Sequence, residues 1–312
     1  MIRLDGATVL LQWATGGLFF LWVTTRHRLV GLGYGWLLRM VFGAIAAGSV
    51  MAGRFGEADL VRDGAGVGVA VVTGAVLAVS VLRKGAGVRA QREEEQRRKD
   101  RVSAMASKRA VAAGAGDAPA DPGTASITMR DEFGRAVDDA ETVRTDGPEF
   151  APVLDLIAPA IGLIGLISGA VGAGGAAWLS IARTVVGALF LGAVSDAMLL
   201  GHWYLVQPGL SRRPLGELND WLLKIWPFEV ALLLLPTGMF SVFNGTIDDH
   251  YGGMLGWFWI ACAVTTGVLG WVTRLALRER FYSAVMAATG LLYLAILTAF
   301  GTDLVARAIL AG

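Results

Sequence analysis

The chain has 312 residues, of which 54% are hydrophobic and only 17% are charged, and its formal net charge is +1 at pH 7. Soluble globular domains carry about 25% charged residues. This composition therefore excludes an ordinary soluble protein and indicates one that lies largely in a lipid bilayer. Nucleic-acid binding is not expected, because the sequence has no basic segment with interleaved aromatic residues.

Long apolar stretches recur along the chain and predict membrane-spanning helices. About twenty apolar residues form a helix that crosses roughly 30 Å of hydrocarbon. Each such stretch must be helical, because backbone polar groups in lipid need partners within their own segment. The expected fold class is an all-α polytopic membrane protein, a bundle of about eight transmembrane helices at residues 7–23, 33–51, 64–82, 151–171, 176–206, 222–243, 254–273 and 282–304.

The basic residues predict how this bundle is oriented. Twenty of the twenty-seven Lys and Arg residues fall in one set of alternate loops. Cytoplasmic loops carry an excess of Lys and Arg, so we expect these loops to be cytoplasmic and both chain termini to be outside. The protein is then a multi-pass protein of the plasma (inner) membrane, with a long cytoplasmic loop between the third and fourth helices.

This long loop divides the chain into three parts. Residues 1–83 hold the first three helices, residues 84–149 form a charged loop or linker, and residues 150–312 hold the other five helices. The basic first half of the loop has high helix propensity, and its acidic, Gly- and Pro-containing second half is typical of a flexible linker. The basic half could contact anionic lipid headgroups or an acidic partner, or it could be a solvated helix that only secures the topology.

Small residues are spaced four apart in several of the predicted helices. Gly165 and Gly169 are one such pair, and Ala188 and Gly192 are another. Small residues at this spacing let helix backbones approach closely in lipid. The expected partner of each helix is therefore another helix of the same chain, with a homo-oligomer or a membrane complex as the alternative.

Three ionisable residues fall inside predicted helices. Arg39, Asp196 and Glu229 each lie roughly 10–14 Å from the cytoplasmic boundary at 1.5 Å per residue. An unpaired charge at the bilayer centre costs at least ~2.5 kcal/mol, so a shared cluster of the three is a reasonable expectation. Such a cluster could relay protons, with Arg39 balancing one carboxylate, or it could be a structural salt bridge that joins three helices. Pro227 is expected to bend the helix beside Glu229.

A dense polar and aromatic motif ends the fifth predicted helix. His202, Trp203 and Tyr204 follow one another in the stretch GHWYLVQPGL. These side chains could bind a quinone-like ligand, with the imidazole on a carbonyl and the indole against the ring. Haem is a second possibility, for which His27 is the available second imidazole. The alternative is an aromatic belt at the membrane surface, where Trp and Tyr anchor a helix end.

No catalytic residue and no metal-ligand set is indicated. The sequence lacks a P-loop and a G-x-S-x-G nucleophile motif, so enzymatic activity is not the favoured interpretation. The leading hypothesis is an accessory membrane subunit that binds a quinone-like or other hydrophobic ligand near an electron-transfer chain. The alternatives are a small proton-coupled transporter that uses the intramembrane carboxylates, and a scaffold that recruits a partner through residues 84–149.

Overall fold

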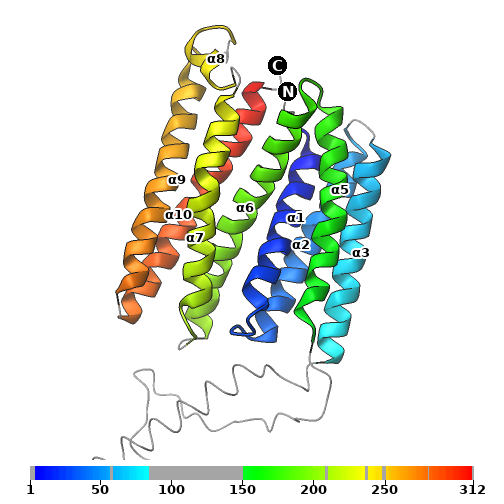
Figure 1. Cartoon of the computed structure of the whole chain (residues 1–312), viewed down its shortest axis with the longest axis vertical. Helices are drawn as coiled ribbons and strands as arrows, with labels where there is room; N and C mark the ends of the chain where they lie inside the picture. The colour runs from blue at the N-terminus through cyan, green and yellow to red at the C-terminus, as the bar shows by residue number, and fades with distance from the viewer. Residues whose placement is uncertain are drawn as a thin grey trace, which may run out of the picture.

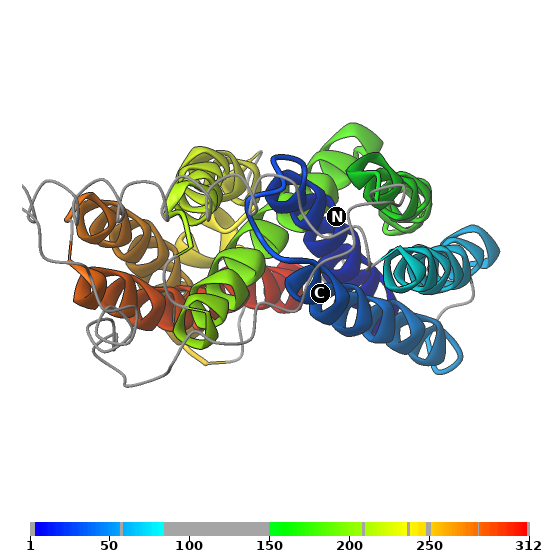
Figure 2. The ribbon, with the colours of Figure 1, turned by 90° about the horizontal axis from the view of Figure 1, so that it is seen from below.

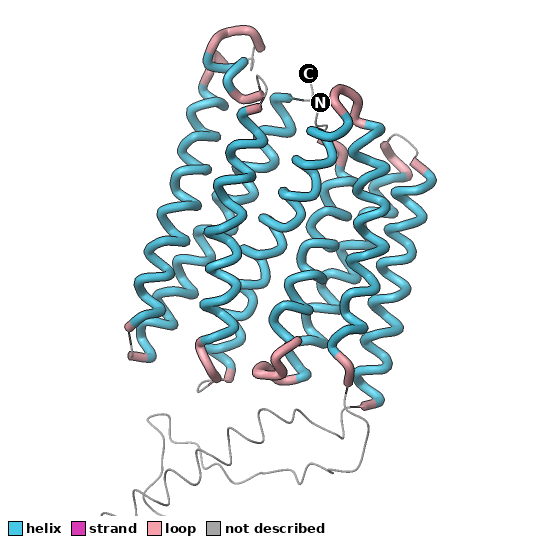
Figure 3. The backbone as a smooth tube through the Cα atoms, in the orientation of Figure 1, coloured by secondary structure: helices cyan, strands magenta, loops and turns pink. Residues whose placement is uncertain are grey.

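The computed structural model describes residues 4–56, 59–83, 150–207, 210–235, 238–247, 251–279 and 281–310. These residues form a bundle of long helices, and no strand occurs among them (Figures 1 and 3). The all-α class predicted from the sequence is confirmed. The elements in chain order are α1 (Gly6–Thr25), α2 (Leu32–Gly53), α3 (Leu60–Leu82), the 3-10 helix η2 (Pro152–Leu156), α5 (Ile157–Gly172), α6 (Ala177–Val206), α7 (Arg213–Leu234), α8 (Phe240–Phe243), α9 (Met254–Arg278) and α10 (Tyr282–Leu310).

Seven of the described helices are long and apolar enough to cross a membrane, which supports a multi-pass membrane protein. They are α1, α2, α3, η2 with α5, α6, α9 and α10. The expected number was eight. The remaining long helix, α7, has 22 residues but carries five charged side chains, and so it is less apolar than the others: Arg213, Glu217, Asp220, Lys224 and Glu229.

The prediction of one apolar helix over residues 222–243 is wrong at both ends. Helix α7 begins at Arg213, nine residues earlier, with Pro214 in the first turn, where a proline is well tolerated. It ends at Leu234, because Leu235 precedes a proline and takes an extended conformation with φ −82° and ψ 156°. The following residues form only the short helix α8.

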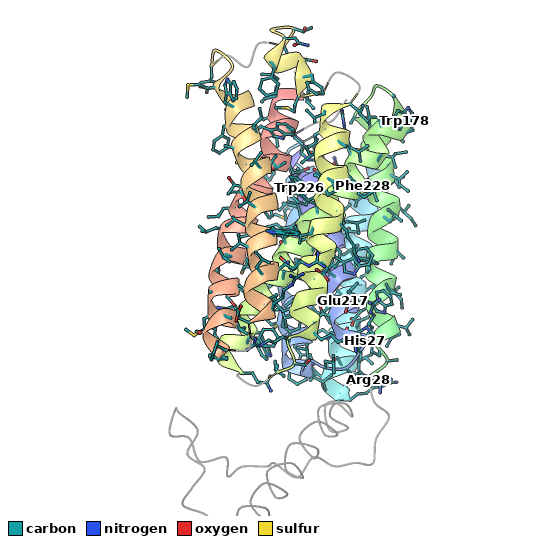
Figure 4. The ribbon with its side chains drawn as sticks, turned by 60° about the vertical axis from the view of Figure 1, so that its left-hand side comes forward. His27, Arg28, Trp178, Glu217, Trp226 and Phe228 are labelled. Carbon is teal, nitrogen blue, oxygen red and sulfur yellow. The ribbon has the colours of Figure 1, made fainter. Side chains whose placement is uncertain are left out.

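Both ends of the chain reach the same end of the bundle (Figure 1). We call this end, where α1 begins and α10 finishes, the terminal end. The opposite end, where α1, α3, α6 and α9 finish, we call the basic end, because the Arg-rich loops lie there; Figure 4 labels His27 and Arg28 at this end. Helix α7 begins at the basic end and runs alongside α6 and α9 toward the terminal end.

Helix α6 lies between two groups of helices, as the view along the bundle shows (Figure 2). On one side α6 contacts α1 and α5, which pack with α2 and α3, and on the other it contacts α7 and α10, which pack with α9. At the crossing with α1, a Cβ added to Gly16 would lie 1.8 Å from the Ala188 carbonyl oxygen, and one added to Gly192 would lie 2.3 Å from the Gly16 carbonyl carbon. The predicted packing of small residues within one chain is confirmed here.

Candidate functional site

Charged side chains are buried at several levels of this bundle. An unpaired charge in a bilayer is costly, so the partners of each buried group decide whether it is structural or free to react. Eight of the described Arg, Asp and Glu residues are at most 4% exposed: Arg39, Arg62, Asp155, Arg183, Asp196, Glu229, Asp303 and Arg307.

Arg39 is held in a closed ion pair near the basic end. Its Nε and one terminal nitrogen each donate to an oxygen of Asp155 in η2, both at 2.8 Å. The guanidinium also stacks on Phe150, with 4.7 Å from Cζ to the ring centroid, and Thr25 donates to Asp155 at 3.3 Å. This bidentate arrangement joins α2 to η2 and satisfies both carboxylate oxygens. The other terminal nitrogen of Arg39 has no hydrogen-bond partner among the described residues.

A larger polar cluster lies near the terminal end and draws on four helices. We call it the Glu229–Asp303 cluster; its members are Gln12 of α1, Arg183 of α6, Glu229 of α7, and Asp303 and Arg307 of α10. Gln12, Arg183, Glu229 and Asp303 each lie five to seven residues from the terminal end of their helix, which corresponds to about 8–10 Å at 1.5 Å per residue. These four side chains therefore come from one level of the bundle.

Hydrogen bonds organise one side of this cluster. Arg307 donates through Nε to Asp303 Oδ2 at 2.8 Å and through a terminal nitrogen to the Gln12 amide oxygen. The Gln12 amide nitrogen is 3.4 Å from the same Asp303 oxygen. Gly187 of α6 leaves room for these groups, because a Cβ there would lie 2.6 Å from the Gln12 nitrogen and 3.0 Å from Asp303 Oδ1.

The other side of the cluster has carboxylate oxygens without partners. Glu229 lies within electrostatic range of Asp303, Arg307 and Arg183. Among the described residues, neither oxygen of Glu229 nor Oδ1 of Asp303 has a hydrogen-bond partner. Both side chains are 0% exposed. These two buried carboxyl groups lie near two arginines, and we take them as the candidate functional site within the described part of the chain.

Arg183 connects this cluster to the end of α7. Its Nε donates to the Leu232 carbonyl oxygen at 2.9 Å, and a terminal nitrogen donates to the Leu235 carbonyl oxygen. The last carbonyls of a helix lack partners within the helix and carry partial negative charge. Arg183 therefore caps α7 while its positive charge stays close to Glu229.

Asp196 is a second buried carboxyl, at a different level. It is 0% exposed, and neither carboxylate oxygen has a partner within the part of the chain that the structure describes. Its backbone carbonyl accepts from the Tyr34 hydroxyl at 3.3 Å. It lies thirteen residues beyond Arg183 on α6, a rise of about 20 Å. It is therefore not part of the Glu229–Asp303 cluster.

The three ionisable residues selected from the sequence thus have three different environments. Arg39 pairs with Asp155, Asp196 lies at its own level of α6, and Glu229 joins α10. Because α7 begins at Arg213, Glu229 lies sixteen residues, or about 24 Å, from the start of its helix, farther than the predicted start at residue 222 implied. The bidentate pair of Arg39 and Asp155 requires both residues to lie at the same depth on helix faces that meet. The spacing of residues along one helix does not reveal whether they do.

Sequence reasoning did not select Asp155, Asp303 or Arg307. Asp155 lies at the start of the predicted helix 151–171. Asp303 and Arg307 are four residues apart in α10, which continues to Leu310, six residues past its predicted end. Charges at this spacing face each other on a helix, and this spacing is the signal that could have found them.

The motif at the end of α6 directs its three side chains to three neighbours. His202 is exposed, with Nδ1 3.0 Å from the Tyr293 hydroxyl of α10. Trp203 packs against Tyr34 of α2, with ring centroids 6.0 Å apart. Tyr204 is buried and donates to the Ser211 carbonyl oxygen at 2.5 Å. The structure does not bring these side chains to one ligand pocket.

The histidine proposed as a second haem ligand has its own partners at the basic end. His27 Nε2 accepts from the Arg26 Nε at 3.1 Å and lies 3.8 Å from Glu217 of α7. Arg26 is also paired with Glu217, and Figure 4 labels His27 and Glu217 together in this region. His27 and His202 therefore belong to different contacts, one with α7 and one with α10.

Comparisons with protein-family models, with curated proteins and with solved structures found no match to this chain. The interpretation of residues 84–149 as a basic helix and an acidic linker lies outside the described residues.

Proposed function

We propose that this protein is a small proton-coupled transporter and that the Glu229–Asp303 cluster is its proton site. The observation that carries the proposal is a pair of fully buried carboxyl groups that have unpartnered oxygens among the described residues and belong to two helices. An unpaired buried carboxylate is costly, and protonation removes most of that cost. Movement of α7 relative to α10 would change the free-energy cost of burying an ionised Glu229. Proton binding would therefore be coupled to this movement.

The proposed orientation follows the positive-inside rule. The basic end would face the cytoplasm, both termini would be outside, and the bundle would lie in the plasma (inner) membrane with α7 as its eighth span. The proton site would then be about two helical turns from the outer surface. A charged helix such as α7 is tolerated in a bundle when its charges face protein or a water-filled space.

Two features favour α7 as the moving element. Pro227 lies inside the helix, two residues before Glu229, and removes the hydrogen bond that would reach back to Leu223. Arg183 holds the far end of the same helix through its last carbonyl oxygens. A helix with a weakened middle and an anchored end can bend at the position of the carboxyl group.

Asp196 would be a second proton-binding position in the same pathway. It lies ten residues before the end of α6, about 15 Å from the basic end. Asp196 lies about 20 Å along α6 from the level of Arg183, which is much longer than a hydrogen bond, so a proton cannot pass directly between Asp196 and the cluster. The proposal therefore requires water between the two levels.

Proton flux into liposomes that contain a trapped pH dye tests this function. We expect a panel of external amino acids, sugars and carboxylic acids to contain at least one compound that accelerates proton entry through the wild-type protein. Glu229→Gln and Asp303→Asn should each slow this flux about tenfold or more, as loss of a proton-transfer group does. The matched control is Glu279→Gln, which removes an exposed carboxylate at the end of α9.

The outcome that contradicts the proposal is equally definite. If the proton flux is unchanged in both Glu229→Gln and Asp303→Asn, the cluster does not take part in proton transfer. Infrared spectroscopy gives an independent check, because a protonated Glu229 should contribute a carboxylic C=O stretch that Glu229→Gln lacks. A wild-type spectrum without that band at any pH that preserves the fold would also overturn the assignment.

The quinone-like ligand and the scaffold remain predictions. The quinone hypothesis drawn from the sequence places His202, Trp203 and Tyr204 around one ligand. In the structure these side chains contact α10, α2 and the loop after α6, respectively. A direct check is solvent extraction of the purified protein: stoichiometric quinone that is lost in His202→Ala would restore that hypothesis.

A further inference from the structure

A groove of about 540 Å³ runs between α7 and α9, and no member of the Glu229–Asp303 cluster lines it. Its lining is apolar along most of its length and charged at one end. The lining residues are Asp220, Leu223, Lys224, Trp226 and Pro227 of α7, and Val264, Gly267, Val268, Trp271 and Arg274 of α9.

The apolar wall is held in a fixed shape. The Trp226 indole N–H donates to the Ala263 carbonyl oxygen of α9 at 2.8 Å. The ring also lies on the backbone of α9 at Gly267, where an added Cβ would be 2.8 Å from it. Trp271 and Val268 remain more than half exposed beside it, at 55% and 54%. Figure 4 shows Trp226 on α7.

The charged end lies nearer the basic end of the bundle. Arg274 is four residues before the end of α9, and Lys224 is eleven residues into α7, which corresponds to about 6 Å and 16 Å of helix. Arg274 Nε is 3.3 Å from Asp220 Oδ1. Two positive groups and one negative group leave a net positive charge at the mouth of an apolar groove.

We propose that this groove binds one anionic phospholipid of the leaflet at the basic end. Lys224 and Arg274 would hold the phosphate, with the long Lys224 side chain extending toward the membrane surface. One acyl chain would lie along Trp226, Val264 and Trp271. Charge complementarity favours an anionic phospholipid, because the cytoplasmic leaflet is rich in anionic lipids and attracts basic groups such as Lys224 and Arg274 near its surface. This inference rests on the orientation proposed above and is independent of the proton site.

Native mass spectrometry of the detergent-purified protein, titrated with phosphatidylglycerol or phosphatidylcholine of the same acyl chains, tests the proposal. We expect the first phosphatidylglycerol to bind more tightly than phosphatidylcholine. The double variant Lys224→Gln/Arg274→Gln should lose about thirtyfold in phosphatidylglycerol affinity, because two surface charges each contribute a few-fold to tenfold. Trp271→Ala should weaken both lipids alike.

Two controls separate binding from folding and from total charge. Arg83→Gln/Arg213→Gln removes two charges at the same end outside the groove and should retain phosphatidylglycerol. Lys224→Arg/Arg274→Lys keeps both charges and should also retain it. The proposal is overturned by equal binding of the two lipids to the wild type, by full retention in the Gln double variant, or by a dimer that covers this face and excludes lipid.

Discussion

At the scale of single residues, buried polar groups in this bundle fall into satisfied and unsatisfied sets. Both oxygens of Asp155 accept from Arg39, at 2.8 Å each, although one terminal nitrogen of Arg39 has no partner among the described residues. Glu229 and Asp303 are equally buried, yet three of their four oxygens have no partner among the described residues. The first pair is suited to hold two elements together. The second is the proton site proposed above, because three of its carboxyl oxygens lack a partner that would compensate a negative charge.

The Arg39–Asp155 pair should therefore matter for stability and not for proton movement. Breaking a buried ion pair from one side leaves an uncompensated charge and costs about 3 to 5 kcal/mol. We expect Arg39→Gln or Asp155→Asn to lower the thermal unfolding midpoint in detergent strongly. The double variant Arg39→Met/Asp155→Leu should recover most of the loss. Additive losses in the double variant would contradict a direct pair.

Gly187 should be a position where one methyl group disturbs the cluster. A Cβ there would press on the Gln12 amide and Asp303, so Gly187→Ala should cost about 1–3 kcal/mol, as overpacking does. The matched control is Gly74→Ala in α3, where a Cβ meets nothing within 4 Å and alanine favours the helix. Unfolding midpoints of both variants check this, and equal midpoints would contradict the close approach of α6 to the cluster.

At the scale of elements, α7 differs from every other long helix that the structure describes. It has the length of a membrane span, but its charges place it outside the set that length and apolarity identify. Its charges are distributed among different neighbours: Glu217 pairs with Arg26, Asp220 pairs with Arg274, and Glu229 faces α10. Partners on adjacent helices make a charged helix tolerable in a bilayer.

Cysteine labelling tests whether α7 crosses the membrane. In a Cys262→Ser background, which removes the single native cysteine, Gly216→Cys at the start of α7 and Asn244→Cys beyond its end should react from opposite sides. A membrane-impermeant maleimide applied to sealed right-side-out vesicles should label only Asn244→Cys. Ala197→Cys, buried in α6, is the unreactive control. Labelling of both end positions from one side would contradict the crossing.

At the scale of the whole molecule, the basic loops lie at the end of the bundle opposite the start of α1 and the end of α10. The chain starts and finishes at the terminal end, and the Arg-containing loops after α1, α6 and α9 all lie at the other end (Figure 1). Helix α6 joins the two groups of helices and crosses α1 closely at Gly16. The Glu229–Asp303 cluster takes Gln12 from one group and Glu229, Asp303 and Arg307 from the other.

The amino-acid sequence by itself determined the all-α membrane class, the approximate places of most helices and the separation of basic from non-basic loops. These properties follow from local rules, since an apolar segment in lipid must satisfy its own backbone hydrogen bonds. The bounds predicted for residues 176–206 differ from those of α6 by one residue at its start. The predicted bounds of the polar sixth helix were wrong because α7 begins with Pro214 in its first turn and ends before the proline that follows Leu235, and neither end is marked by a change in apolarity.

Only the tertiary structure decided which buried charges meet. Arg39 and Asp155 are 116 residues apart in the chain, and Gln12 and Asp303 are 291 apart. Whether such groups touch depends on the depth and rotation of helices that pack through small residues at distant points. Those quantities are set by side-chain packing between helices, which the periodicity of any one helix does not encode.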